Sequence, residues 1–117
     1  MEDVHATDIF SCLASPVRLQ VFRLLLECEP HGLVAGEIAS RLDVPPANLS
    51  FHLKALAHVG LVCHAQQGRF QRYRADVPLM QEVLDYMTGM CCAGHPEHCL
   101  PPDQVRQAKP QEVDRGA

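Results

Sequence analysis

GEIASRLDVPPANLSFHLKALAHVGLV, residues 36–62, is the stretch of sequence that decides the fold. A first helix is predicted over about 35–42, with three apolar side chains turned inward: Ile38, Ala39 and Leu42. After a short turn, apolar residues again recur at helical spacing: Leu49, Leu53, Leu56 and Val59. Gly60 follows as a natural C-terminal cap. Two helices joined by a turn of a few residues are typical of a helix-turn-helix.

Two more helices are predicted before this motif. Residues 5–15, HATDIFSCLAS, carry apolar residues at the spacing of a short amphipathic helix. Ser15 and Pro16 then provide an N-cap and a first turn for a helix over 16–28. Its inward residues are expected to be Val17, Val21, Leu24, Leu25 and Cys28. We predict that Cys12 and Cys28 are core residues, because an unpaired cysteine packs like a small hydrophobic side chain.

A β-hairpin is predicted after the helix-turn-helix. Residues 61–76, LVCHAQQGRFQRYRAD, alternate between apolar and polar side chains in two arms. The QQGR stretch between the arms indicates a turn in which Gly68 adopts a positive φ. Cys63 is expected to pack inward from the first strand, and a role as a metal ligand is the alternative.

Residues 77–90, VPLMQEVLDYMTGM, form the last predicted helix, and its apolar residues occur on more than one side. We expect the excess apolar surface to pack against a partner subunit, with burial inside the monomer as the alternative. The order of elements predicts a winged helix-turn-helix. This fold is mainly α with a small β-hairpin (α+β), and it is expected to dimerise through its terminal helices.

Length and composition indicate one globular domain. The chain has 117 residues, of which 47% are hydrophobic and 21% charged. Residues 1–90 are assigned to this domain, 91–99 to a cysteine-rich metal-binding loop and 100–117 to a disordered tail. No apolar run approaches the roughly 20 residues that span a bilayer, and no signal peptide is recognisable. We therefore expect a cytoplasmic protein without a membrane partner.

Charge is distributed unevenly along the chain. The net charge is −4, yet the stretch 44–75 contains none of the fourteen acidic residues. The same stretch carries four basic residues and three histidines; the basic residues are Lys54, Arg69, Arg72 and Arg74. A locally basic face on an acidic protein indicates nucleic-acid binding, with chance clustering as the alternative. An enzyme is not expected, because the sequence has no phosphate loop and no recognisable nucleophile–base arrangement.

The segment MCCAGHPEHCL, residues 90–100, places two adjacent cysteines seven positions before a third. In a reducing compartment, closely spaced cysteines more often bind metal or perform redox chemistry than form structural disulfides. Gly89 and Gly94, together with Pro96, allow the backbone to leave the helix. The chain can then turn so that thiolates of Cys91, Cys92 and Cys99 surround one atom.

Three blocks of this sequence resemble the ArsR (ArsR/SmtB) family of bacterial metal-sensing repressors. They are LASPVRLQVFRLLL at 13–26, the helix-turn-helix at 36–62 with Ser50, His52 and Leu53 as its Ser-x-His-Leu signature, and GRFQRYRAD at 68–76. The resemblance implies a homodimer that binds a palindromic operator in double-stranded DNA. It also implies that metal binding lowers DNA affinity.

The resemblance places a recognition helix in the major groove and the hairpin on the DNA backbone or minor groove. The groove-facing candidates are Ala47, Asn48, Ser50, Phe51, His52 and Lys54. Asn48 can pair with adenine, and Ser50 can donate or accept. His52 has a second interpretation, which is to hold the helix in place by packing and a hydrogen bond. The hairpin arginines suit phosphate contacts, with a solvated strand face as the alternative: Arg69, Arg72 and Arg74.

The family's usual inducer sites are absent from this sequence. Well-known arsenic sensors carry ELCVCDL before the recognition helix, whereas this chain reads GLVAGEI, with Val34 and Gly36 at the cysteine positions. Zinc sensors use ligands that include histidine along the last helix, and 77–90 has no histidine.

A branch of the family with a vicinal cysteine pair and a third cysteine after the last helix resembles this chain. Its members bind arsenic(III) and often antimony(III), so the implied metal ligands are Cys91, Cys92 and Cys99. Zinc completed by His95 or His98 is an alternative, as are cadmium and lead. Two further alternatives are a redox switch with a disulfide to Cys99, and three incidental thiols. A metal-buffering protein without DNA binding is the rival class of function.

Overall fold

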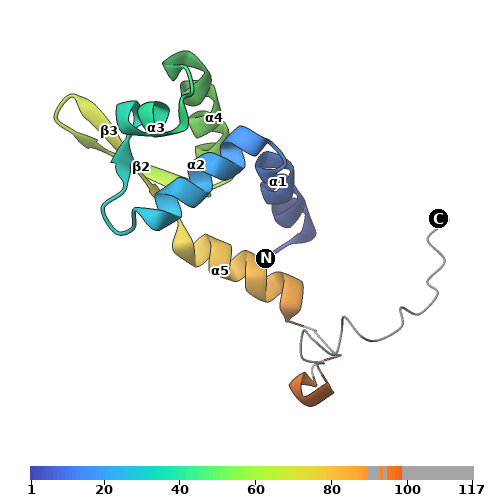
Figure 1. Ribbon diagram of the computed structural model, residues 1–117. Coiled ribbons are helices and arrows are strands. Elements are labelled where there is room, and N and C mark those ends of the chain that lie inside the picture. The colour runs from blue at the N-terminus through green and yellow to red at the C-terminus, as the bar shows by residue number, and fades with distance from the viewer. Residues whose placement is uncertain (90–92, 94, 99–117) are drawn as a thin grey trace, which may run out of the picture. The chain divides into compact units, whose positions relative to one another are not determined.

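The computed structural model describes residues 1–89, 93 and 95–98. The chain divides into two units, 1–86 and 87–117, which are described separately. The elements in chain order are α1 (Asp3–Leu13), α2 (Pro16–Glu27), β1 (Leu33–Val34), α3 (Ala35–Leu42), α4 (Pro46–His58), β2 (Val62–Gln67), β3 (Phe70–Ala75), α5 (Val77–Thr88) and the short 3₁₀ helix η2 (Pro96–His98). In Figure 1 the β2–β3 hairpin extends away from the helices and lies beside α3 and α4. The predicted winged helix-turn-helix is confirmed.

The second helix begins where the sequence predicts a cap. Ser15 is extended, and its hydroxyl accepts the backbone N–H of Arg18 at 3.4 Å, while Pro16 occupies the first turn of α2. Helix α2 buries Val21 and Leu25, as expected, and also Phe22, which was not predicted. Cys12 is buried and Cys28 is half-buried against the core.

The helix-turn-helix consists of α3 and α4. Asp43 ends α3 in the left-handed region with φ of 53°. Helix α4 begins with a proline in its first turn and buries three leucines from one face: Leu49, Leu53 and Leu56. Gly60 follows α4 at φ of 87°, and a Cβ there would lie 3.3 Å from Leu79, so glycine suits both the turn and the approach of α5.

A three-stranded antiparallel sheet has the order β1-β3-β2. The predicted hairpin is present, with Val62 opposite Ala75 and Gly68 at φ of 61° in the turn. Strand β1 was not predicted, because two residues are too short for a periodicity to be read. Gly32 has φ of 71°, and a Cβ there would overlap the Tyr73 carbonyl oxygen. Only glycine therefore lets the chain enter β1 beside β3.

The prediction that Cys63 packs inward is wrong. Val62 is the inward residue of β2, and Cys63 is exposed beside its cross-strand partner Arg74. Because successive side chains of a strand point to opposite faces, burial of Val62 turns Cys63 outward. Leu61 is also buried, but it precedes the strand. The prediction counted Leu61 as the first inward residue of the strand, and Cys63, two positions later, was therefore expected to point inward as well.

Within the described residues, no single helix has the length and apolar character to cross a membrane. The pair α1 and α2 reaches that threshold together, across a 99° bend.

Candidate nucleic-acid interface and cysteine segment

The recognition helix α4 has one buried apolar face and one exposed polar face. Leu49 and Leu53 hold it on the core, while the N-terminal residues between and beside them are exposed: Ala47, Asn48, Ser50, Phe51 and Lys54. Phe51 is 64% exposed although it is a large apolar side chain. The predicted groove-facing residues thus share one accessible surface, except for His52.

His52 is half-buried and contacts α2 instead of lying fully in solvent. Its Nδ1 accepts a hydrogen bond from Nε of Arg18 at 3.2 Å. The same guanidinium lies 5.7 Å from the centre of the Phe51 ring. Arg18 therefore links α2 to two successive residues of α4. Sequence reasoning missed Arg18, because only the fold brings a residue of the second helix beside the fourth.

The three arginines of the β2–β3 hairpin, called the wing below, have different environments. Arg72 donates from Nε to Gln67 at 2.8 Å and from Nη1 to the Gly32 carbonyl at 3.1 Å. Arg74 forms an ion pair with Glu29 at 2.8 Å, and this carboxylate raises the pKa of Arg74. Arg69 is exposed at the turn and has no hydrogen bond or ion pair with any described residue.

Arg72 and Arg74 thus attach the wing to the loop between α2 and β1. Only Arg69, among the three, presents its full charge to an external partner.

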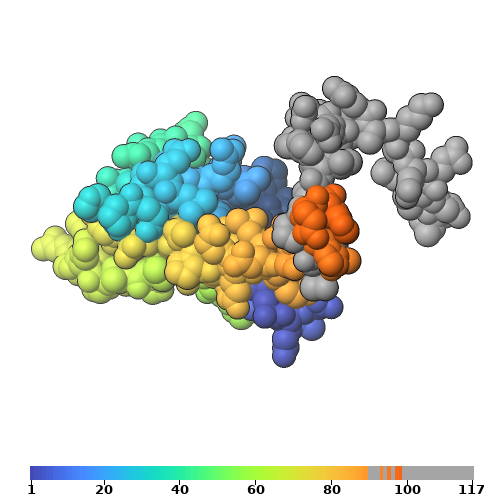
Figure 2. Space-filling view, turned by 90° about the horizontal axis from the view of Figure 1, so that it is seen from below, coloured from blue at the N-terminus to red at the C-terminus, as the bar shows by residue number. Residues whose placement is uncertain are grey.

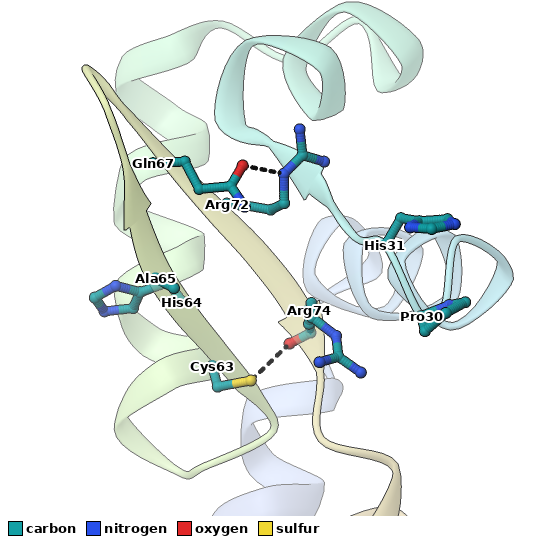
Figure 3. Close-up of a pocket in the computed structure, with 8 residues that line it drawn as sticks. All are labelled: Pro30, His31, Cys63, His64, Ala65, Gln67, Arg72 and Arg74. Carbon is teal, nitrogen blue, oxygen red and sulfur yellow. Dashed lines mark hydrogen bonds between the residues drawn. The ribbon is translucent and has the colours of Figure 1, made fainter.

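A cavity of about 660 Å³ lies between the wing and the loop after α2 (Figure 3). Residues from both strands and the loop line it: Pro30, His31, Cys63, His64, Ala65, Gln67, Arg72 and Arg74. The Cys63 thiol donates to the Arg74 carbonyl at 3.7 Å, so this exposed thiol is weakly held. Cys12 differs, because burial raises the pKa of its thiol despite the nearby Arg18.

Helix α5 begins at an Asp76 cap, whose carboxylate accepts the Leu79 N–H at 3.0 Å. Val83 is its one fully buried side chain among the described residues. Leu84 is 48% exposed and Met87 is 58% exposed, and Tyr86 is also exposed. Figure 2 shows α5, in orange, lying along the surface of this face of the molecule. Apolar surface of this extent on one helix is typical of a protein interface.

Three comparisons with known proteins bear on this geometry. The family described as a helix-turn-helix domain matches residues 13–63. Transcriptional repressor SdpR of Bacillus subtilis is 22% identical over 80 residues, covering 68% of this chain and 86% of that protein. A structure of reduced HlyU from Vibrio cholerae is 30% identical with a TM-score of 0.58, covering 72% of this chain and 88% of that one.

An ArsR-like transcriptional regulator from Rhodococcus sp. RHA1 has the same fold, with a TM-score of 0.67 and 25% identity. The match covers 76% of this chain and 81% of that one. The chain belongs to the ArsR family. It is a transcriptional regulator of the ArsR/SmtB type, with α3 and α4 as its DNA-binding helix-turn-helix.

The metal ligands predicted from the ArsR resemblance, Cys91, Cys92 and Cys99, lie outside the described residues. Helix α5 ends at Thr88, three positions before Cys91. Val34 and Gly36, at the family's other cysteine positions, belong to β1 and α3 and provide no ligand. Between the predicted ligands, His95, Glu97 and His98 are described, and their ligand atoms all lie within 4.8 Å of one another.

Proposed function

We propose that the chain is an arsenic(III)- or antimony(III)-responsive repressor that binds operator DNA as a homodimer. Binding of the metalloid to Cys91, Cys92 and Cys99 releases the DNA. The observation that carries the DNA-binding part is the exposed, acid-free face of α4, with Asn48, Ser50 and Lys54 on it. Polar side chains at the N-terminal end of a recognition helix reach base edges in the major groove.

The inducer assignment rests on the chemistry of the thiols and on elimination. Arsenic(III) and antimony(III) are soft and prefer thiolate ligands. The described cysteines are Cys12, Cys28 and Cys63, and they form no cluster of three metal-ligating groups. We therefore assign the three-thiolate site to Cys91, Cys92 and Cys99, whose spacing in the sequence suits a single three-coordinate atom.

The dimer part rests on the exposed apolar residues of α5, which include Leu84 and Met87. A second copy of the chain would remove this surface from water. Because α5 ends three residues before Cys91, an ion that draws the thiolates together acts directly on the end of the proposed dimer helix. Allostery then requires only that the metalloid bind more tightly to the state that does not fit DNA.

An operator-release assay tests the proposal. The full chain is bound to a labelled duplex from the promoter region of its own gene, and fluorescence anisotropy is followed as arsenite or antimonite is added under reducing conditions. We expect release from the wild type and retention by Cys92→Ser. Cys63→Ser, which removes an exposed thiol of the wing, is the matched control and is expected to release DNA normally.

Each outcome addresses one part of the proposal. If the chain binds no duplex in a salt-dependent manner, the repressor assignment is wrong and a metal-buffering protein is favoured. If DNA binding is normal but only zinc, cadmium or lead releases it, the inducer class is wrong. If the Cys91, Cys92 and Cys99 triple serine variant still releases DNA on arsenite, the site is wrong.

A thiol-redox repressor is the second candidate, because one similar structure is described as the reduced form of HlyU. The two candidates differ in what releases the operator. Diamide without metalloid would release DNA from a redox repressor, and mass spectrometry would find a disulfide to Cys99. Arsenite in excess reductant would release DNA only from a metalloid sensor.

A further inference from the structure

The short helix η2 and the residue before it bring two imidazoles and one carboxylate together. The Nδ1 atom of His95 lies 3.1 Å from Oε1 of Glu97, and Nε2 of His98 lies 3.9 Å from the same oxygen. The two imidazole rings are stacked, with centroids 5.0 Å apart. Within the described residues, this is the one group of three metal-ligating side chains whose ligand atoms lie within 4.8 Å of one another.

Those separations are close to what a small divalent cation requires. Zinc is held at about 2.0–2.2 Å from imidazole nitrogen and carboxylate oxygen in a tetrahedral arrangement. Ligand atoms of such a site are therefore roughly 3.3 Å apart along each edge. The Nδ1–Oε1 distance already satisfies this, and the Oε1–Nε2 distance requires closure by a fraction of an ångström. The two imidazole nitrogens lie within 4.8 Å of each other and must also approach.

Little opposes such a closure. The side chains of His95, Glu97 and His98 are each about 60% exposed, so no buried packing restricts their rotamers. One oxygen of the Glu97 carboxylate already lies within 4 Å of a nitrogen of each imidazole, so all three groups meet on one short turn. The other described histidines lack this arrangement; His5, for example, contacts the backbone oxygen of Val59, and His64 contacts the Gln71 amide.

We propose that His95, Glu97 and His98 form a binding site for a borderline divalent cation of the zinc class. The site is separate from the three thiols proposed to bind the metalloid. Two imidazoles and a carboxylate are a ligand set that holds catalytic zinc in proteins, with a fourth position left open. Soft arsenic(III) prefers the thiolates, whereas nitrogen and oxygen ligands suit zinc, cobalt and nickel. This site does not depend on the proposed inducer.

Metal binding to the full-length chain without the three thiols tests the assignment. In the Cys91, Cys92 and Cys99 triple serine variant, zinc is titrated by calorimetry, and zinc X-ray absorption identifies the ligands. We expect one zinc per chain, bound by nitrogen and oxygen only. His95→Asn, His98→Asn and Glu97→Gln, each added to the triple variant, are expected to weaken zinc binding at least tenfold.

His31→Asn in the same triple variant is the matched control, because His31 is an exposed histidine in the other unit of the chain. It is expected to leave zinc affinity unchanged. Circular dichroism checks that each variant folds, which is expected for the added substitutions because the side chains of His31, His95, Glu97 and His98 are exposed.

Two results would overturn the proposal. If the wild type binds zinc through sulfur and the triple serine variant binds none, the histidines at most complete a thiolate site. If the triple variant binds zinc and His95→Asn and His98→Asn weaken it no more than His31→Asn does, the ion is held elsewhere.

Discussion

Helices α4 and α5 are nearly equal in length, yet they divide their surfaces differently. Helix α4 buries three leucines and exposes polar side chains, Lys54 and one large apolar residue, Phe51. Helix α5 buries Val83 and exposes Leu84 and Met87. A surface with exposed hydrogen-bonding groups is suited to binding nucleic acid, whereas exposed apolar surface is suited to binding another protein. The two helices therefore point to two different partners.

The largest effect of a substitution is expected on the buried face of α4, where it lowers the free energy of unfolding. Leu53 is 2% exposed, so Leu53→Ala leaves a cavity and is expected to lower the free energy of unfolding by about 2–5 kcal/mol. Lys54→Ala changes the next, exposed residue and is expected to alter that free energy by less than about 0.5 kcal/mol. Equilibrium denaturation in urea measures both. Equal losses would contradict the division of α4 into a buried and an exposed face.

The buried face of α4 could largely be predicted from the sequence. Helical spacing located Leu49, Leu53 and Leu56, because the buried face of an amphipathic helix is encoded locally. The contact from Arg18 to His52 could not be predicted, since it joins residues 34 positions apart. Strand β1 was not predicted because two residues are too few to show an alternating pattern. Cys63 was assigned to the wrong face of the sheet because the buried Leu61, which precedes the strand, was counted as its first inward residue.

The candidate site was predicted as a set of residues, but not as a set of contacts. The three wing arginines look alike in the sequence, and only the fold pairs Arg74 with Glu29 and Arg72 with Gly32. Likewise, the sequence places His95 and His98 near the cysteines. It does not reveal that one oxygen of Glu97 lies near a nitrogen of each ring, because that depends on the turn of η2.

The second largest effect is expected for a substitution on the exposed face of α5, and it concerns dimer stability. Met87→Glu places a charge on the apolar surface, and in a dimer interface that charge would be buried without a partner. We expect the dimer dissociation constant to rise by about 10- to 100-fold, or roughly 1.4–2.7 kcal/mol. Sedimentation velocity over a concentration series measures this change.

Phe51→Glu is the control for this prediction, because Phe51 is similarly exposed but belongs to α4. It is expected to leave the dimer intact and to abolish operator binding. If Phe51→Glu dissociates the dimer as strongly as Met87→Glu, the separation of the two surfaces is wrong.

A smaller effect is expected in the wing. Arg69 has no hydrogen bond or ion pair with any described residue, whereas Arg74 is paired with Glu29. Arg69→Ala is expected to weaken operator binding about tenfold, or roughly 1.4 kcal/mol. The slope of log affinity against log salt should become shallower by about one, because one cation no longer neutralises a phosphate. Arg74→Ala should change that slope less, and the reverse ranking would show that the ion pair opens on DNA.

The smallest effect concerns the link between α2 and α4. A double-mutant cycle of Arg18→Ala and His52→Ala is expected to give a coupling of about 0.5–1.5 kcal/mol in the free energy of unfolding, the range of a single hydrogen bond. The same cycle on operator affinity separates the two interpretations of His52. If His52 positions α4 through Arg18, its loss weakens DNA binding only while Arg18 is present. If His52 contacts a base, its loss weakens binding equally in both backgrounds, and the two effects add.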